Sequence, residues 1–173
     1  GDINPGGHLP YTVYANLDGV PPQKEYDVSK GYTYQYFKGV PLYAFGHGLS
    51  YTRFQYSHVA LSAPAMAANG SVQVSFDITN VGNLAGSDVA QLYTHQAHSV
   101  TYQPIQSLRA FQRVSLAPGE TRHVSFTLTA SQLAYYSTVR KGSFVEPGAF
   151  DLMIGSASDD IRLRARLSVT GKG

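Results

Sequence analysis

Carboxylates are the side chains of this sequence with the greatest capacity for chemistry. The chain has eleven Asp and Glu residues, and one adjacent pair, Asp159-Asp160. Two carboxyl groups held close together can act as general acid and base. However, neighbouring residues of a strand point to opposite faces, and in a loop such residues bond local backbone amides. We therefore predict that this chain contains no catalytic residue. Turn or solvent-facing positions are expected for the other acids considered: Asp18, Asp77, Asp88, Glu120 and Glu146.

The histidines offer one spacing that resembles a metal site. His95 and His98 form an H-x-x-H motif in a predicted loop. Metal sites need three or four ligands and supporting hydrogen bonds, and the sequence has no Cys and no third ligand close by. We interpret both histidines as structural or solvent-exposed, and we predict no metal and no cofactor. Ser50 lacks the G-x-S-x-G context of a nucleophile, so we assign it a turn or capping role.

Aromatic residues form a cluster in the first third of the chain. Its members are Tyr32, Tyr34, Tyr36, Phe37, Tyr43, Phe45 and Tyr51. Aromatic rings can stack on the apolar faces of sugars, and the candidate substrate-binding contacts would then be Tyr34, Tyr36 and Phe37. Alternatively, the rings dock this segment against a folded body, since burying one aromatic side chain contributes about 1.5–3 kcal/mol. We favour docking, which the Gly46-x-Gly48 pair supports because glycine permits close approach.

Composition excludes two classes of partner. The net charge is +2 and charged residues make up 14% of the chain, which gives no electrostatic footprint for nucleic acid. No apolar run approaches the roughly 20 residues that a membrane helix needs. The sequence opens with neither an initiator Met nor a signal-peptide pattern, and we therefore expect it to be a piece of a larger protein. A secreted or periplasmic location is favoured.

The sequence divides into two regions of different character. In residues 1–53, Gly, Pro, Asn and Asp interrupt every short apolar run, and no face is long enough to build a core. Residues 9–14 and the alternating residues 31–37 are predicted to be short strands. We expect this region to be an extended linker that wraps over a neighbouring body.

Residues 54–173 alternate regularly between apolar and polar residues. Strands are predicted at about 54–61, 71–79, 89–93, 108–116, 124–128, 150–155 and 161–167, with a shorter one at 144–145. A capping box, Thr129-x-x-Gln132, predicts one helical turn as far as Tyr135. About seven short strands with a turn every 8–12 residues are typical of an all-β sandwich. In the last strand we expect Arg162, Arg164 and Arg166 on a solvated edge face.

An ordered series of motifs resembles one enzyme family along nearly the whole chain. Residues 1–10, GDINPGGHLP, look like the end of the α/β domain of glycoside hydrolase family 3, and residues 41–52, PLYAFGHGLSYT, are similar to that family's junction motif. Residues 80–93 and 108–120 resemble its fibronectin type III-like C-terminal domain. His47, Ala44, Tyr32 and Gln35 depart from the commoner Tyr, Pro and two Arg residues.

The resemblance implies a fold and a function. The fold would be an immunoglobulin or fibronectin type III-like sandwich over residues 54–173, preceded by the end of an α/β domain and an aromatic linker in residues 1–53. The parent would be a retaining β-glucosidase or β-xylosidase that hydrolyses terminal non-reducing β-linked sugars. Its catalytic Asp and Glu would lie upstream of Gly1. The chain would then be a non-catalytic module that packs on the upstream barrel and α/β domains. The alternative is an autonomous carbohydrate-binding module, whose partner would be a β-linked oligosaccharide.

Overall fold

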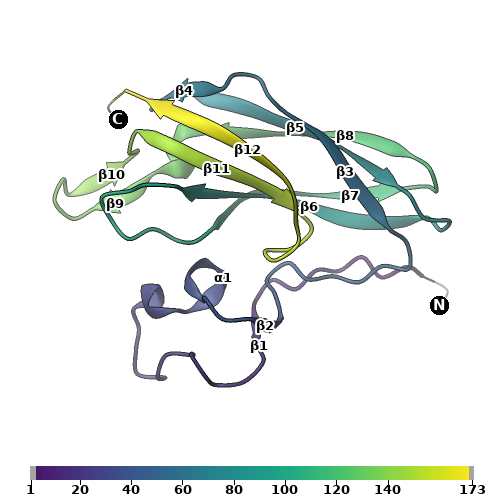
Figure 1. Cartoon of the computed structure of the whole chain (residues 1–173), viewed down its shortest axis with the longest axis horizontal. Coiled ribbons are helices and arrows are strands. Elements are labelled where there is room, and N and C mark those ends of the chain that lie inside the picture. Colours follow the sequence, from purple (N-terminus) through teal and green to yellow (C-terminus); the bar gives the residue numbers. More distant parts are fainter. Residues whose placement is uncertain (1–2, 172–173) are drawn as a thin grey trace.

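The computed structural model describes residues 3–171 and consists of a two-layered β-sandwich with a linker segment (residues 3–53) lying along one side (Figure 1). One layer is a five-stranded sheet in the order β4-β12-β11-β6-β7, and the other is a three-stranded sheet in the order β3-β5-β8. The strands of these two sheets are β3 (Phe54–Leu61), β4 (Ala65–Ala67), β5 (Ser71–Asn80), β6 (Gly86–Gln96), β7 (Ser107–Leu116), β8 (Thr121–Thr129), β11 (Gly148–Gly155) and β12 (Ile161–Thr170).

Alternation along the strands places the apolar side chains between the layers. In β5, every second residue from Val72 to Ile78 is buried, while Gln73 is exposed. The antiparallel register with β8 sets Val74 opposite Phe126, so apolar residues of the two strands share the inner face. Each such side chain contributes about 1.5–3 kcal/mol when fully buried. The predicted all-β sandwich is confirmed.

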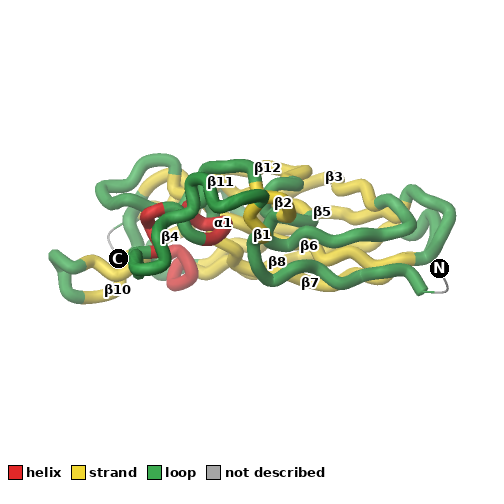
Figure 2. Tube along the Cα trace, turned by 90° about the horizontal axis from the view of Figure 1, so that it is seen from below, coloured by secondary structure: helices red, strands yellow, loops and turns green. Residues whose placement is uncertain are grey.

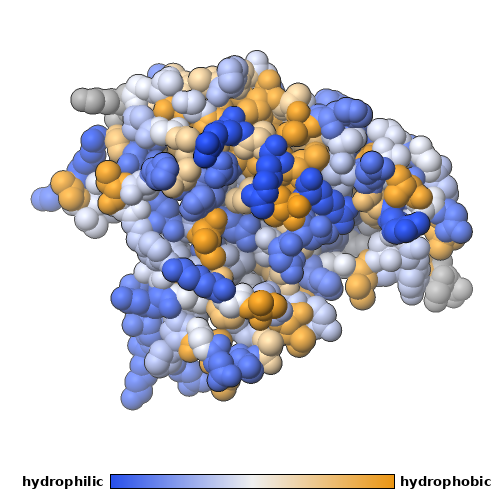
Figure 3. All heavy atoms as spheres, in the orientation of Figure 1, coloured by the Kyte–Doolittle hydropathy of each residue, from blue (hydrophilic) through white to orange (hydrophobic). Residues whose placement is uncertain are grey.

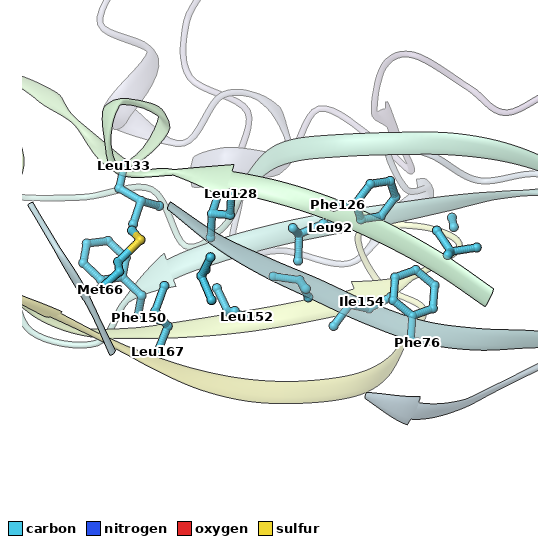
Figure 4. Packing of buried hydrophobic residues seen from close by; sticks show 14 of the residues in the cluster. Met66, Phe76, Leu92, Phe126, Leu128, Leu133, Phe150, Leu152, Ile154 and Leu167 are labelled. Carbon is cyan, nitrogen blue, oxygen red and sulfur yellow. The ribbon is translucent and has the colours of Figure 1, made fainter. Parts of the chain in front are cut away.

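The core runs the length of the sandwich (Figure 4). Phe76 and Phe126 from the smaller sheet face Leu92 and Ile154 from the larger one. At the other end Met66 of β4 packs in the same cluster, which places this short strand in the core. The sandwich therefore closes around a single apolar cluster in which aromatic and branched side chains fill both ends.

The seven long strands of the sandwich match the seven expected. Three short strands depart from the prediction: β4 pairs in parallel with the end of β12, and β9 (Tyr135–Ser137) forms a hairpin with β10 (Gly142–Phe144). The predicted strand at 144–145 thus ends one residue earlier. The helical turn at the capping box is the 3₁₀ helix η2 (Ala130–Leu133), which stops before Tyr135 because that residue enters β9.

The linker segment contains only short elements. They are β1 (Val13–Tyr14), η1 (Val28–Lys30), the one-turn helix α1 (Thr33–Tyr36) and β2 (Pro41–Tyr43), which pairs with β1. The predicted strand at residues 9–14 is reduced to its last two residues. The predicted strand at 31–37 is wrong, since this stretch forms α1. A helical turn can direct Tyr34 and Tyr36 to different neighbours, whereas alternating strand residues i and i+2 would share one face.

The last strand carries its arginines on the solvent side, as expected. Arg162, Arg164 and Arg166 are exposed, and β4 pairs only with residues 168–170, so most of β12 forms a charged sheet edge. Arg162 differs from the other two because it also donates to the Phe54 carbonyl oxygen at 2.8 Å. Within the described residues, 3–171, no helix combines the length and apolar character needed to span a bilayer.

Candidate functional site at the linker–sandwich junction

Backbone hydrogen bonds fix the linker segment to the sandwich, and two of them lie well before the chain enters β3. The amide of Ser158, in the β11–β12 loop, donates to the carbonyl of Phe45 at 2.9 Å. The amide of Ile105, just before β7, donates to the carbonyl of Gln35 at 2.8 Å. Figure 2 shows the linker following the sandwich along its length. The expectation that this region wraps over a neighbouring body therefore holds for the sandwich itself.

Gly46 brings the linker backbone into contact with a buried amide. It has a φ of +82°, and a Cβ atom there would overlap the side-chain amide of Gln91. Gln91 is buried on β6, donates to the Ser156 carbonyl and accepts from the Tyr93 hydroxyl. At Gly48 a Cβ would lie 2.7 Å from His8 Nε2. Both glycines of the Gly46-x-Gly48 pair are therefore required by close approach.

His8 is the titratable linker residue at this junction. Its Nδ1 lies 2.5 Å from the Gly46 carbonyl oxygen and 3.1 Å from that of Ser156, and its Nε2 lies 3.4 Å from Asp88 Oδ1. Carbonyls and a carboxylate only accept hydrogen bonds, so both ring nitrogens are placed to carry a proton. Burial disfavours the charged form, but the Asp88 carboxylate and the two carbonyls outweigh it and raise the pKa of His8.

Asp88 connects His8 to the sandwich core. It was expected at a turn or on a solvent-facing surface, but that prediction is wrong, because the linker covers its side of β6 and leaves it 6% exposed. The Tyr56 hydroxyl donates to Asp88 Oδ2 at 2.9 Å, and burial raises the pKa of Tyr56, which keeps that proton in place. Arg162 Nη1 lies 3.9 Å from the same oxygen. The buried carboxylate is thus compensated on every side, as burial demands.

A second carboxylate, Asp160, lines the same hollow of about 350 Å³ as Asp88. Arg162 bonds Asp160 at 2.7 Å and Ser156 Oγ donates to it at 2.6 Å, and these bonds lower the pKa of Asp160. A general acid needs a raised pKa. Asp160 is therefore an ion-pair partner of Arg162 within the sandwich, while Asp88 supplies the contact with His8 of the linker. We expected the carboxylates of Asp159 and Asp160 to accept hydrogen bonds from local backbone amides. The carboxylate of Asp160 instead accepts them from the side chains of Ser156 and Arg162.

Tyr34 is an aromatic contact between the linker and the larger sheet. Its ring stacks on Phe45 with centroids 4.2 Å apart and meets Tyr93 edge-on at 5.9 Å. Its hydroxyl accepts a hydrogen bond from the Leu108 amide at 3.1 Å. Since β6 and β7 supply Tyr93 and Leu108, this tyrosine contacts two strands at once.

Tyr36 and Phe37 lie apart from that contact. Phe37 meets Tyr14 edge-on at 4.8 Å, inside the linker segment. The ring of Tyr36 lies 5.6 Å from that of Tyr102, in the loop between β6 and β7. The three candidate substrate-binding residues are therefore not brought to one surface: Tyr34 packs on the sheet, Phe37 on β1, and Tyr36 lines two hollows beside Tyr102.

The H-x-x-H histidines are not brought into a metal site in the described part of the chain. His95 Nδ1 lies 3.0 Å from the Pro104 carbonyl oxygen, while His98 is exposed. No group of three His, Asp or Glu side chains with metal-binding geometry occurs within residues 3–171. Sequence reasoning missed His8 and Asp88, although the near-continuous apolar run that follows Asp88 in β6 is typical of a strand covered on both faces.

Comparison with known proteins agrees with this architecture. A family model described as "Fibronectin type III-like domain" matches residues 88–158. Thermostable beta-glucosidase B of Acetivibrio thermocellus is 38% identical over 98% of this chain and 24% of its own length. A beta-xylosidase of Formosa agariphila is 35% identical over 94% of this chain and 23% of its own length. The chain therefore spans about a quarter of the length of the curated relatives it matches.

Solved structures give the same result. The beta-D-glucoside glucohydrolase of Trichoderma reesei superposes with a TM-score of 0.85 at 31% identity, over 98% of this chain and 27% of that one. The GH3 beta-glucosidase of Bifidobacterium adolescentis superposes with a TM-score of 0.86 at 25% identity, over 96% and 26%. The chain belongs to glycoside hydrolase family 3, in which it corresponds to the C-terminal fibronectin type III-like portion.

Proposed function

We propose that this chain acts as the non-catalytic C-terminal module of a retaining β-glycosidase, a β-glucosidase or β-xylosidase that hydrolyses terminal non-reducing β-linked sugars. Residues 1–53 would form the end of the preceding α/β domain and the linker, and residues 54–173 the sandwich. The catalytic carboxylates would lie outside this chain. The names of the relatives, which include beta-glucosidases and beta-xylosidases, support this activity for the whole protein. One relative is named a periplasmic beta-glucosidase, which supports a secreted or periplasmic location.

The observation that carries the proposal is the exposed apolar surface of the linker segment. Residues 3–53 supply ten of the eighteen large apolar side chains that are exposed in the described chain: Ile3, Tyr11, Leu17, Tyr26, Val28, Val40, Leu42, Tyr43, Leu49 and Tyr51. A concentration of this kind marks a surface that contacts another protein body. Since the same segment is bonded to the sandwich, it is placed to join the sandwich to the catalytic domains.

The test is to weaken this surface without touching the junction. We expect the double substitution Leu42→Ser and Tyr43→Ser, in the full-length protein that carries this chain, to lower its thermal midpoint by several degrees. Both side chains are about half exposed here and would be buried against the catalytic body. The control is Val139→Ser, in the β9–β10 turn, where a side chain 91% exposed should tolerate the change. Equal midpoints for both variants would argue against the proposal.

A further inference from the structure

Tyr36 and Tyr102 form an aromatic ridge between two hollows, beside the junction. One hollow, of about 500 Å³, lies toward Lys38, and the other, of about 490 Å³, lies toward Arg109 and Tyr136. Both volumes fall in the range of small-molecule sites. The outline of the molecule is indented between the β9–β10 hairpin and the linker segment, the elements that bound the second hollow (Figure 3).

The second hollow combines aromatic, polar and apolar side chains. Most of its polar side chains are neutral amides and hydroxyls, including Gln35 and Gln103. Among the described residues that line this hollow, Arg109 is the one that carries a charge. The aromatic residues on its rim are well exposed, Tyr102 at 61% and Tyr136 at 66%. Tyrosine presents an apolar face together with a hydroxyl, which suits a ligand that is apolar on one side and hydroxylated on its edges.

Arg109 adds an unused hydrogen-bond donor. Its Nε donates to Thr94 Oγ1 at 2.9 Å, and no acidic side chain of residues 3–171 pairs with it. The guanidinium carries five N–H groups in a fixed fork and cannot accept. Burial lowers the pKa of Arg109 but leaves it charged. A partly buried fork that lines the hollow is suited to donate to ligand hydroxyls or ring oxygens.

We infer that the Tyr36–Tyr102 ridge is a glycan-binding surface for a β-linked oligosaccharide. A pyranose ring would stack on an exposed tyrosine face, while Gln103 and Arg109 bond its hydroxyls. The expected β linkage rests on the proposed function, but the surface itself belongs to this chain and needs no catalytic domain. Binding here would hold a polymeric substrate close to the enzyme, separately from its cleavage.

The test is calorimetric titration of the 173-residue chain with xylohexaose and with cellohexaose. We expect saturable binding of at least one sugar, about tenfold weaker in Tyr102→Ala and in Tyr136→Ala, because each loses a stacking face. Tyr102→Phe should retain binding because it keeps the ring. The control is Tyr51→Ala, of similar exposure (57%) but outside both hollows. Circular dichroism verifies that each variant is folded.

Three results would overturn the inference. The first is no heat with either sugar, and the second is equal weakening by Tyr51→Ala and Tyr102→Ala. The third is a loss of thermal stability of the full-length protein in Tyr102→Ala without sugar binding by the chain, which would assign the ridge to contact with the catalytic domains. These outcomes leave the Leu42 and Tyr43 test of the proposed function untouched, so the two can fail separately.

Discussion

At the scale of single residues, His8 is the most sensitive point of the junction. It faces Asp88 directly, and behind that carboxylate lie Tyr56 and Arg162, the latter paired with Asp160. Arg162, which lines the same hollow as His8, is therefore already engaged by two carboxylates. An imidazolium is accommodated here because every atom that contacts its ring nitrogens accepts a hydrogen bond.

The protonation of His8 makes the stability of the chain depend on pH. The pKa of His8 is raised in the folded state, so its contribution is fully present below about pH 6.5 and is lost as the pH rises through the raised value. We expect His8→Gln to cost about 1 kcal/mol of unfolding free energy at pH 5.5 and less at high pH. Urea unfolding at several pH values measures this. His98→Gln, at an exposed position, is the control. A cost that grows with pH would contradict the assignment.

Gly46 offers a matched test of close packing. Gly19 has nearly the same backbone, with a φ of +77° against +82°, but a Cβ there would meet no atom within 4 Å. Both alanine variants incur the cost of a left-handed conformation, about 1 kcal/mol. Gly46→Ala must also displace Gln91, so we expect it to cost roughly 2 kcal/mol more. Denaturant unfolding of both variants measures the difference, and equal costs would show that the contact with Gln91 does not matter.

At the scale of elements, the linker segment should be able to separate from an intact sandwich. We expect Tyr34→Ala to lose about 2 kcal/mol of local stability, because the ring stacks on Phe45 and touches Tyr93. Hydrogen exchange would then quicken at the amides of Ile105 and Ser158, which bond across the junction, while the amides of β5 keep their protection. Tyr26→Ala, at a side chain 89% exposed, is the control. Uniform loss of protection would mean that the two parts unfold together.

The sandwich could be predicted from the sequence because its strands alternate between apolar and polar residues. In β5 and β8, one face is buried and the other is not, so alternation is visible in the residues themselves. The same reasoning failed at Thr33–Tyr36, where alternating tyrosines were interpreted as a strand. Each of those rings contacts a residue far away in the chain, Tyr93 and Tyr102, and local pattern holds no information about such partners.

The junction was predicted only in part, because its contacts join residues that are far apart in the sequence. The Gly46-x-Gly48 pair predicted close approach because glycine lacks a Cβ atom. The aromatic cluster predicted docking because aromatic rings have a large apolar surface to bury. Asp88 could not be placed, since its burial depends on a linker that covers β6 from more than forty residues away. A buried charge becomes predictable only when its partners, here His8 and Arg162, are known to meet.

At the scale of the whole molecule, the chain combines a closed core with an exposed apolar linker. We expect the purified 173-residue chain to release no nitrophenol from aryl β-glucosides or β-xylosides above the rate of buffer. Asp160 has a lowered pKa and is paired with Arg162, so it cannot act as a general acid near neutral pH. The control is the full-length protein at equal concentration. Turnover by the chain alone that survives Asp160→Asn would reveal a different catalytic pair, and turnover of any kind would contradict a non-catalytic module.

The central claim is that the sandwich stabilises the catalytic domains through the linker segment. Its most direct test is the thermal midpoint and the residual activity of the full-length protein after deletion of residues 54–173. We predict a midpoint lowered by several degrees and a matching loss of activity on heating, because the linker loses the contacts of His8, Tyr34 and Gly46. A deletion protein with unchanged midpoint and unchanged activity would contradict the account.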